Sequence, residues 1–186
     1  MKGLHFLSIA LLGIILTVSS CSVDEPLPVN EEEVITTLRY VLTPTGGGDA
    51  VIFEFQDLDG DGGDDPIITN GTLAANTAYS GSIELLNEAE SPVEDITVEI
   101  RAEAEAHQFF YATTATDLTI GYNDADTNNQ PIGLETAVNT GAATTGTLTI
   151  TLRHEPLKSA DNVANGDITN AGGETDIEVT FDVTIQ

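Results

Sequence analysis

Basic residues are scarce in this chain, which has 5 Lys and Arg against 31 Asp and Glu over 186 residues and a formal net charge of −26. A nucleic-acid-binding surface needs a stripe of cations to neutralise phosphates. So few cations cannot supply that stripe, and the composition therefore argues against DNA or RNA as a partner.

Cysteine is rarer still, with a single residue in the chain. One Cys excludes a disulfide framework and any zinc ribbon built on cysteines. Disorder is excluded for a different reason, because hydrophobic residues make up 40% of the chain and fall in alternating runs. That apolar content is enough for one hydrophobic core.

The N-terminus reads as an export signal. Lys2 provides a cationic start, and the apolar run 4–18 has the length of a secretory h-region rather than of a spanning helix. Val18-Ser19-Ser20-Cys21 follows and resembles a bacterial lipobox, in which a signal peptidase cuts before a cysteine that is then acylated. We therefore expect residues 1–20 to be a lipoprotein signal peptide and Cys21 to carry palmitate or a similar acyl chain.

Removal of the signal peptide makes the protein more acidic. Residues 1–20 contain Lys2 and no acid, so 31 acidic and 4 basic residues remain, a net charge of −27. Residues 21–33 are rich in proline and acids and predict a flexible tether between the lipid and the domain. Acids at positions 24 and 25 resemble export tags of surface lipoproteins, which favours the cell-surface face of the outer membrane. This match covers only a few residues, and the periplasmic face is the alternative.

Residues 34–186 are expected to form a single, mainly β domain. Apolar and polar residues alternate along 177–185, which is typical of a strand with one buried and one solvated face. Ser91, Pro92 and Glu94 form a helix-start pattern, so one short helix is expected near 92–104. Further strands are expected at 37–43, 51–55, 82–86, 109–112, 118–122 and 148–152, spaced as in an antiparallel β-sandwich.

The strand pattern also repeats. Blocks at 53–59, 66–67 and 81–85 recur at 120–126, 131–132 and 146–150. Two halves of this size would each bury little surface alone, so the repeat (about 37–92 and 107–156) predicts one sandwich built from two similar halves. The segment from Leu73 to Tyr79 resembles the tyrosine corner of immunoglobulin-like modules, which implies that architecture and a phenol bonded to nearby backbone.

Two acidic loops are calcium candidates. Alternate acids on a Gly-rich turn aim several hard oxygens at one centre, although the twelfth position of the first loop is Ile68 rather than a closing carboxylate. An Asx-turn-rich hairpin with solvated acids is the alternative. The candidate ligands are Asp57, Asp59, Asp61 and Asp65 in the first loop and Asp124, Asp126, Asn128 and Glu135 in the second.

Histidine is the other residue type that attracts metals, and only His107 and His154 remain after maturation. His154 continues the apolar face of strand 148–152, and His107 shares a helical face with Ile100 if the expected helix persists. Both residues are then expected to be imidazoles at the edge of the core. The alternative is a shared zinc or copper site completed by Glu105 or Glu155.

Signatures of catalysis are missing. The chain has no nucleophile elbow and no phosphate loop, and acylation removes Cys21 as a nucleophile. We therefore expect a protein that is not an enzyme.

Taken together, the lipobox, the acidic tether and the segments 107–111 and 152–156 resemble small acidic lipoproteins found beside TonB-dependent outer-membrane receptors. The resemblance implies an outer-membrane location and an association with uptake, with such a receptor as a partner. The leading hypothesis is a lipid-anchored, non-enzymatic binding or accessory module that assists the capture of a metal or metal complex. The alternative is a structural or adhesive surface domain rigidified by calcium.

Overall fold

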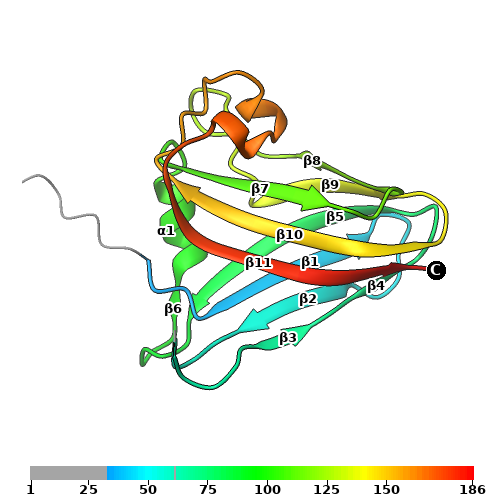
Figure 1. Cartoon of the computed structure of the whole chain (residues 1–186), viewed down its shortest axis with the longest axis horizontal. Helices are drawn as coiled ribbons and strands as arrows, with labels where there is room; N and C mark the ends of the chain where they lie inside the picture. The colour runs from blue at the N-terminus through cyan, green and yellow to red at the C-terminus, as the bar shows by residue number, and fades with distance from the viewer. Residues whose placement is uncertain (1–32, 61) are drawn as a thin grey trace, which may run out of the picture. The chain divides into compact units, whose positions relative to one another are not determined.

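Two β-sheets packed face to face make up the domain in the computed structural model (Figure 1). The structure describes residues 33–60 and 62–186, so the expected signal peptide, Cys21 and nearly all of the expected tether lie outside the described residues. Within the described part, no helix is long and apolar enough to cross a membrane.

The larger sheet has seven strands in the order β3-β2-β1-β5-β9-β8, with β6 paired to β5. All its pairings are antiparallel. Its strands are β1 (Thr37–Pro44), β2 (Val51–Gln56), β3 (Ile67–Thr69), β5 (Ala78–Asn87), β6 (Glu94–Asp95), β8 (Leu118–Tyr122) and β9 (Glu135–Thr140).

The smaller sheet has the order β4-β11-β10-β7. Its strands are β4 (Thr72–Leu73), β7 (His107–Thr113), β10 (Thr144–His154) and β11 (Glu174–Ile185), and only β4 runs parallel to its neighbour. The expected mainly β sandwich is therefore confirmed, and every strand predicted from alternation is present.

The core lies between the sheets because each contributes one apolar face. Tyr40 and Phe53 come from the larger sheet, Phe109 and Phe181 from the smaller one, and all four are fully buried. The rings of Phe53 and Phe181 meet edge to face with centroids 5.6 Å apart, which is a favourable aromatic geometry.

The tyrosine of the predicted corner bonds to nearby backbone, as expected. Tyr79 is buried, and its phenol oxygen accepts a hydrogen bond from the Ala74 amide at 2.8 Å.

The two halves of the sequence repeat do not occupy equivalent positions in the sheets. β2 and β8 both lie in the larger sheet, whereas β5 is central in that sheet and its counterpart β10 belongs to the smaller one.

The helix is shorter than the sequence predicted. α1 spans Ile96–Ala102, and its N-cap is Asp95 rather than Ser91. Residues 94 and 95 pair with β5, and Thr97 exchanges hydrogen bonds with the Leu85 backbone, so the chain is held against the sheet until residue 96. The extension to residue 104 is also wrong, and His107 begins strand β7 rather than continuing a helical face.

A long excursion between β10 and β11 covers the outer face of β7. It contains two short 3₁₀ helices, η1 (Val163–Asn165) and η2 (Ile168–Asn170). Phe110 packs against Val163 and Ala171 in a small second core, so the first half of β7 is buried on both faces. This cover is one reason why the start of β7 is well shielded from water.

Candidate metal centre

Two histidines face each other at one end of the smaller sheet. His107 is the first residue of β7, His154 is the last residue of β10, and the two are directly paired in the antiparallel register. Their ring centroids lie 4.6 Å apart at an interplanar angle of 64°. The sequence favoured two core-edge imidazoles and left a shared site as the alternative, and the pairing of their strands is what brings the two rings together.

Two carboxylates join the histidines, and neither was a predicted candidate. Asp176 comes from the start of β11, where the register with β10 skips from Ile177 to Thr175, which makes Asp176 the extra residue of a β-bulge. Bulges re-aim a side chain that regular alternation would point elsewhere. Glu33 comes from the segment just before β1, so the group joins the entry of the larger sheet to three neighbouring strands of the smaller one.

The spacing of the four side chains suits a small ion. His107 Nε2 lies 3.2 Å from Glu33 Oε1 and 3.9 Å from Asp176 Oδ2, while His154 Nδ1 lies 3.9 Å from an oxygen of each carboxylate. A tetrahedral zinc ion with ligands at about 2.0–2.2 Å holds them roughly 3.3–3.6 Å from one another. The observed separations bracket this range, and the four ligand atoms all lie within 4.8 Å of one another.

A backbone carbonyl fixes the orientation of His107. Nδ1 lies 3.2 Å from the carbonyl oxygen of Glu103, the C-cap residue of α1. A carbonyl only accepts hydrogen bonds, so Nδ1 carries a proton, and in the neutral imidazole the Nε2 lone pair faces the carboxylates and His154. Metal-binding histidines are commonly oriented by such a hydrogen bond to the other ring nitrogen.

The group is almost closed to water. The exposed side-chain fractions are 0% for His107, 3% for Asp176, 8% for Glu33 and 14% for His154. Burial lowers the pKa of His107 below its usual value, which favours the neutral imidazole that metals bind.

Three atoms of the group are buried without a hydrogen bond: His107 Nε2, His154 Nδ1 and Glu33 Oε2. An unsatisfied buried polar atom costs about 1–3 kcal/mol, so three in one place call for an explanation. A divalent cation among them would satisfy all three and offset the repulsion between the two carboxylates.

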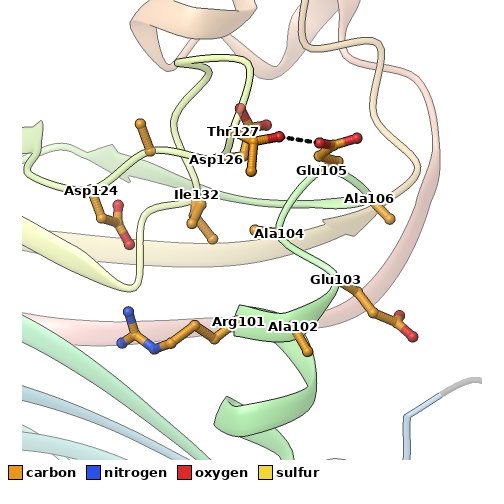
Figure 2. Close-up of a pocket in the computed structure, with 11 residues that line it drawn as sticks. Arg101, Ala102, Glu103, Ala104, Glu105, Ala106, Asp124, Asp126, Thr127 and Ile132 are labelled. Atoms are coloured by element: carbon orange, nitrogen blue, oxygen red, sulfur yellow. Dashed lines mark hydrogen bonds between the residues drawn. The ribbon is translucent and has the colours of Figure 1, made fainter.

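Glu105 and Glu155, which the sequence suggested as partners of the histidines, do not join them. Glu155 follows β10 in a left-handed backbone conformation and is exposed. Glu105 lines a separate hollow of about 440 Å³ between the end of α1 and the loop before β9, where its carboxylate accepts a hydrogen bond from Thr127 (Figure 2).

The second acidic loop uses its carboxylates to hold backbone amides. Asp124 accepts from the amides of Gly133 and Glu135, and Asp126 Oδ1 accepts from those of Asn128 and Gln130. Glu135 instead lies 3.6 Å from Arg101, at the surface. Bonds of this kind are typical of Asx turns and leave the predicted calcium ligands dispersed.

Asp126 has a further partner that the sequence did not suggest. Its Oδ2 accepts a hydrogen bond from Lys158 Nζ at 3.0 Å, and both side chains are buried. Burial alone would raise the pKa of Asp126, but hydrogen bonds from the Gln130 amide and from Lys158 hold it below its usual value. Lys158 also donates to the carbonyls of Ala104 and Pro131, so this one side chain joins the end of α1 to the loop before β9.

The first acidic loop shows similar turn contacts. Asp57 accepts from the Gly60 amide and Asp59 from the Asp64 amide, while Asp65 is exposed and Asp61 lies outside the described residues. Over residues 33–60 and 62–186, the group of Glu33, His107, His154 and Asp176 is the one set of three or more candidate ligands gathered closely enough for an ion.

Comparison with known proteins adds no relative. No family model matches the chain, and neither a curated protein nor a solved structure shows significant similarity to it. The geometry of the described residues is therefore the basis for any functional proposal.

Proposed function

We propose that this protein is a lipid-anchored, non-enzymatic module of the outer membrane or cell surface that binds a divalent transition-metal ion and assists its uptake. The observation that carries the proposal is the buried group of Glu33, His107, His154 and Asp176. Two imidazoles with two carboxylates suit zinc and its neighbours in the first transition row, whereas calcium takes oxygen ligands.

Binding is favoured over catalysis by the number of ligands. Catalytic zinc sites keep one coordination position open for water or substrate, whereas sites that only hold the ion have four protein ligands. Here four side chains surround one point and three of them are less than a tenth exposed. Such a site retains an ion and offers no free position for a reactant.

The lipobox and the tether support the proposed location. Glu33 lies twelve residues after Cys21 in the sequence. Twelve residues span at most about 40 Å, so an acylated Cys21 would keep the metal close to the membrane surface. The resemblance to lipoproteins beside TonB-dependent receptors supports such a receptor as the partner that accepts the metal or metal complex.

The experiment that tests this proposal is metal analysis of the protein purified from its own cells without chelators. We expect close to one equivalent of zinc or another transition metal per chain, and a loss of that metal in the His107→Ala His154→Ala double variant. The proposal would be contradicted if the purified protein held no transition metal, or if the double variant held as much metal per chain as the unmodified protein. Co-purification with an outer-membrane receptor tests the proposed partner separately.

A further inference from the structure

Glu33 differs from the other three members of the group in how the chain holds it. His107, His154 and Asp176 lie on β7, β10 and β11, which are neighbours in one hydrogen-bonded sheet. Glu33 belongs to no strand and is the last residue of the expected tether, four residues before β1 begins at Thr37.

The backbone is first secured to the sheet a few residues later. The Thr36 amide donates to the Leu86 carbonyl at 3.0 Å, and the Thr36 hydroxyl accepts from the Glu88 amide. Between Glu33 and Thr36, Val34 is 60% exposed and Ile35 is only partly buried against the core. Two side chains of this short segment therefore face inward: Glu33, which is 8% exposed, and Ile35.

The segment also has space beside it. A hollow of about 440 Å³ is lined by Val34, Ile35 and Thr36 on one side and by Ile177, the neighbour of Asp176, on another. The segment is thus not packed on every side, and its path could change into this hollow.

A four-ligand buried site raises the question of how an ion enters or leaves. The backbones of the three sheet ligands are fixed by the β7-β10-β11 pairing, whereas the backbone at Glu33 could withdraw with no loss of a strand. Because Glu33 contributes one of the two charges that neutralise a divalent ion, its withdrawal would both open the site and weaken it.

We propose that Glu33 acts as a metal-dependent clasp: the bound ion ties the end of the lipid tether to the sandwich, and release of the ion goes with release of this segment. This inference rests on the proposed metal-binding function and adds its regulation. Ion occupancy then controls how the domain is held at the membrane, and tension or binding at the tether in turn changes metal affinity, because coupling between the two is reciprocal.

The test is hydrogen exchange of the acylated protein in detergent micelles, with zinc and with a chelator, combined with a zinc titration. In the unmodified protein we expect zinc to slow exchange at Val34 and Ile35. In Glu33→Gln we expect zinc affinity to fall by at least about tenfold, and saturating zinc to leave exchange at Val34 and Ile35 unchanged.

Glu155→Gln is the matched control, because it removes the same charge next to His154 but outside the group. This variant is expected to keep both the affinity and the zinc-dependent protection. Circular dichroism of both variants checks that the sandwich is intact.

The outcomes separate the two proposals. If zinc binds the unmodified protein but leaves exchange at residues 34 and 35 unchanged, or if Glu33→Gln binds zinc as tightly as the unmodified protein, the clasp is overturned and the metal site stands. If zinc does not bind the unmodified protein at all, the metal-binding function itself fails and the clasp fails with it.

Discussion

His107 and His154 occupy directly opposed positions on β7 and β10, with ring centroids 4.6 Å apart and three buried polar atoms of their group lacking hydrogen bonds. In the proposed site, a bound ion would satisfy these atoms and offset the cost of burying them. Folding stability should depend on metal, because a ligand that binds only the folded state stabilises it by mass action.

Zinc should raise the melting temperature. At a free concentration about 100 times the dissociation constant, the gain is about 2.7 kcal/mol, or roughly 5–10 °C for a domain of this size. Differential scanning calorimetry with zinc and with a chelator measures it. His107→Ala should abolish the increase, whereas Glu155→Gln should retain it, and an equal increase in both would argue against the assignment.

Calcium should have no comparable effect. The carboxylates of the second acidic loop hold backbone amides, and Asp126 is already bonded to Lys158. We therefore expect no measurable calorimetric heat with millimolar calcium and a melting temperature that shifts by less than about 1 °C. A calcium-dependent increase that Asp57→Asn removed would instead favour the calcium-rigidified alternative, with the ion in the first loop.

Lys158 is expected to be a sensitive position. Lys158→Met would leave the buried Asp126 carboxylate without its cation and two buried carbonyls without their donor. Breaking a buried ion pair in this way costs about 3–5 kcal/mol, measured here by urea unfolding at pH 7. The Asp126→Asn Lys158→Met double variant should recover part of the lost unfolding free energy. A loss of less than about 1 kcal/mol in Lys158→Met would show that the contacts of Lys158 do not stabilise the fold.

Lowering the pH should weaken the hydrogen bonds that Glu88 accepts from Thr37 and Gln56. Hydrogen bonds from Thr37 and Gln56 lower the pKa of Glu88. A carboxyl whose pKa is lower in the folded state stabilises the fold above its unfolded pKa, near 4.5, and this contribution is lost as the pH falls through the folded value.

The variant that checks this is Thr37→Val, which removes the hydroxyl 2.5 Å from Glu88 Oε2. We expect a loss of about 1 kcal/mol at pH 7 that shrinks as the pH falls below the unfolded pKa, measured by urea unfolding over a series of pH values. Thr45→Val is the control, because its hydroxyl donates to a carbonyl and its effect should not vary with pH. A Thr37→Val effect independent of pH would refute the explanation.

Gly81 should tolerate no side chain. A Cβ at this position would lie 2.2 Å from Thr136 Oγ1 and 2.9 Å from atoms of Leu42 and Tyr40, in the part of the core where Tyr40 and Thr136 share a hydrogen bond. Overpacking of this kind typically costs about 1–3 kcal/mol. Gly46→Ala, where a Cβ meets nothing within 4 Å, should change the unfolding free energy by less than about 0.5 kcal/mol, and equal effects would contradict the packing argument.

Acylation of Cys21 remains a prediction from the lipobox. Labelled palmitate should enter the protein in cells and disappear in Cys21→Ala, which should also leave the membrane fraction. Unchanged labelling in the variant would show that the lipid is attached elsewhere.

The strands were predictable where alternation was carried by large apolar residues, as in β11. β9 was missed because two of its inward residues are the polar Thr136 and Thr140, whose buried hydroxyls bond to Tyr40 and to the Ala74 carbonyl. The helix start was misplaced because pairing with β5 overrode a good local capping sequence.

The candidate site was half predictable for similar reasons. His154 continues an apolar face, and its pairing with His107 brought the two imidazoles together. Glu33 resembles its acidic neighbours in the tether, and Asp176 enters the group through a bulge, so neither carries a local signal. The net charge of −26 and the spacing of the acids favoured the two acidic loops as metal sites. The group of four candidate ligands instead forms between segments far apart in the sequence.

The most direct measurement is isothermal titration calorimetry of the chelator-treated protein with zinc, compared with the His107→Ala His154→Ala variant. A metal centre at Glu33, His107, His154 and Asp176 predicts one saturable site per chain that the double variant lacks while its circular dichroism spectrum stays β-rich. Absence of zinc binding to the unmodified protein, or identical binding by both proteins, would contradict it.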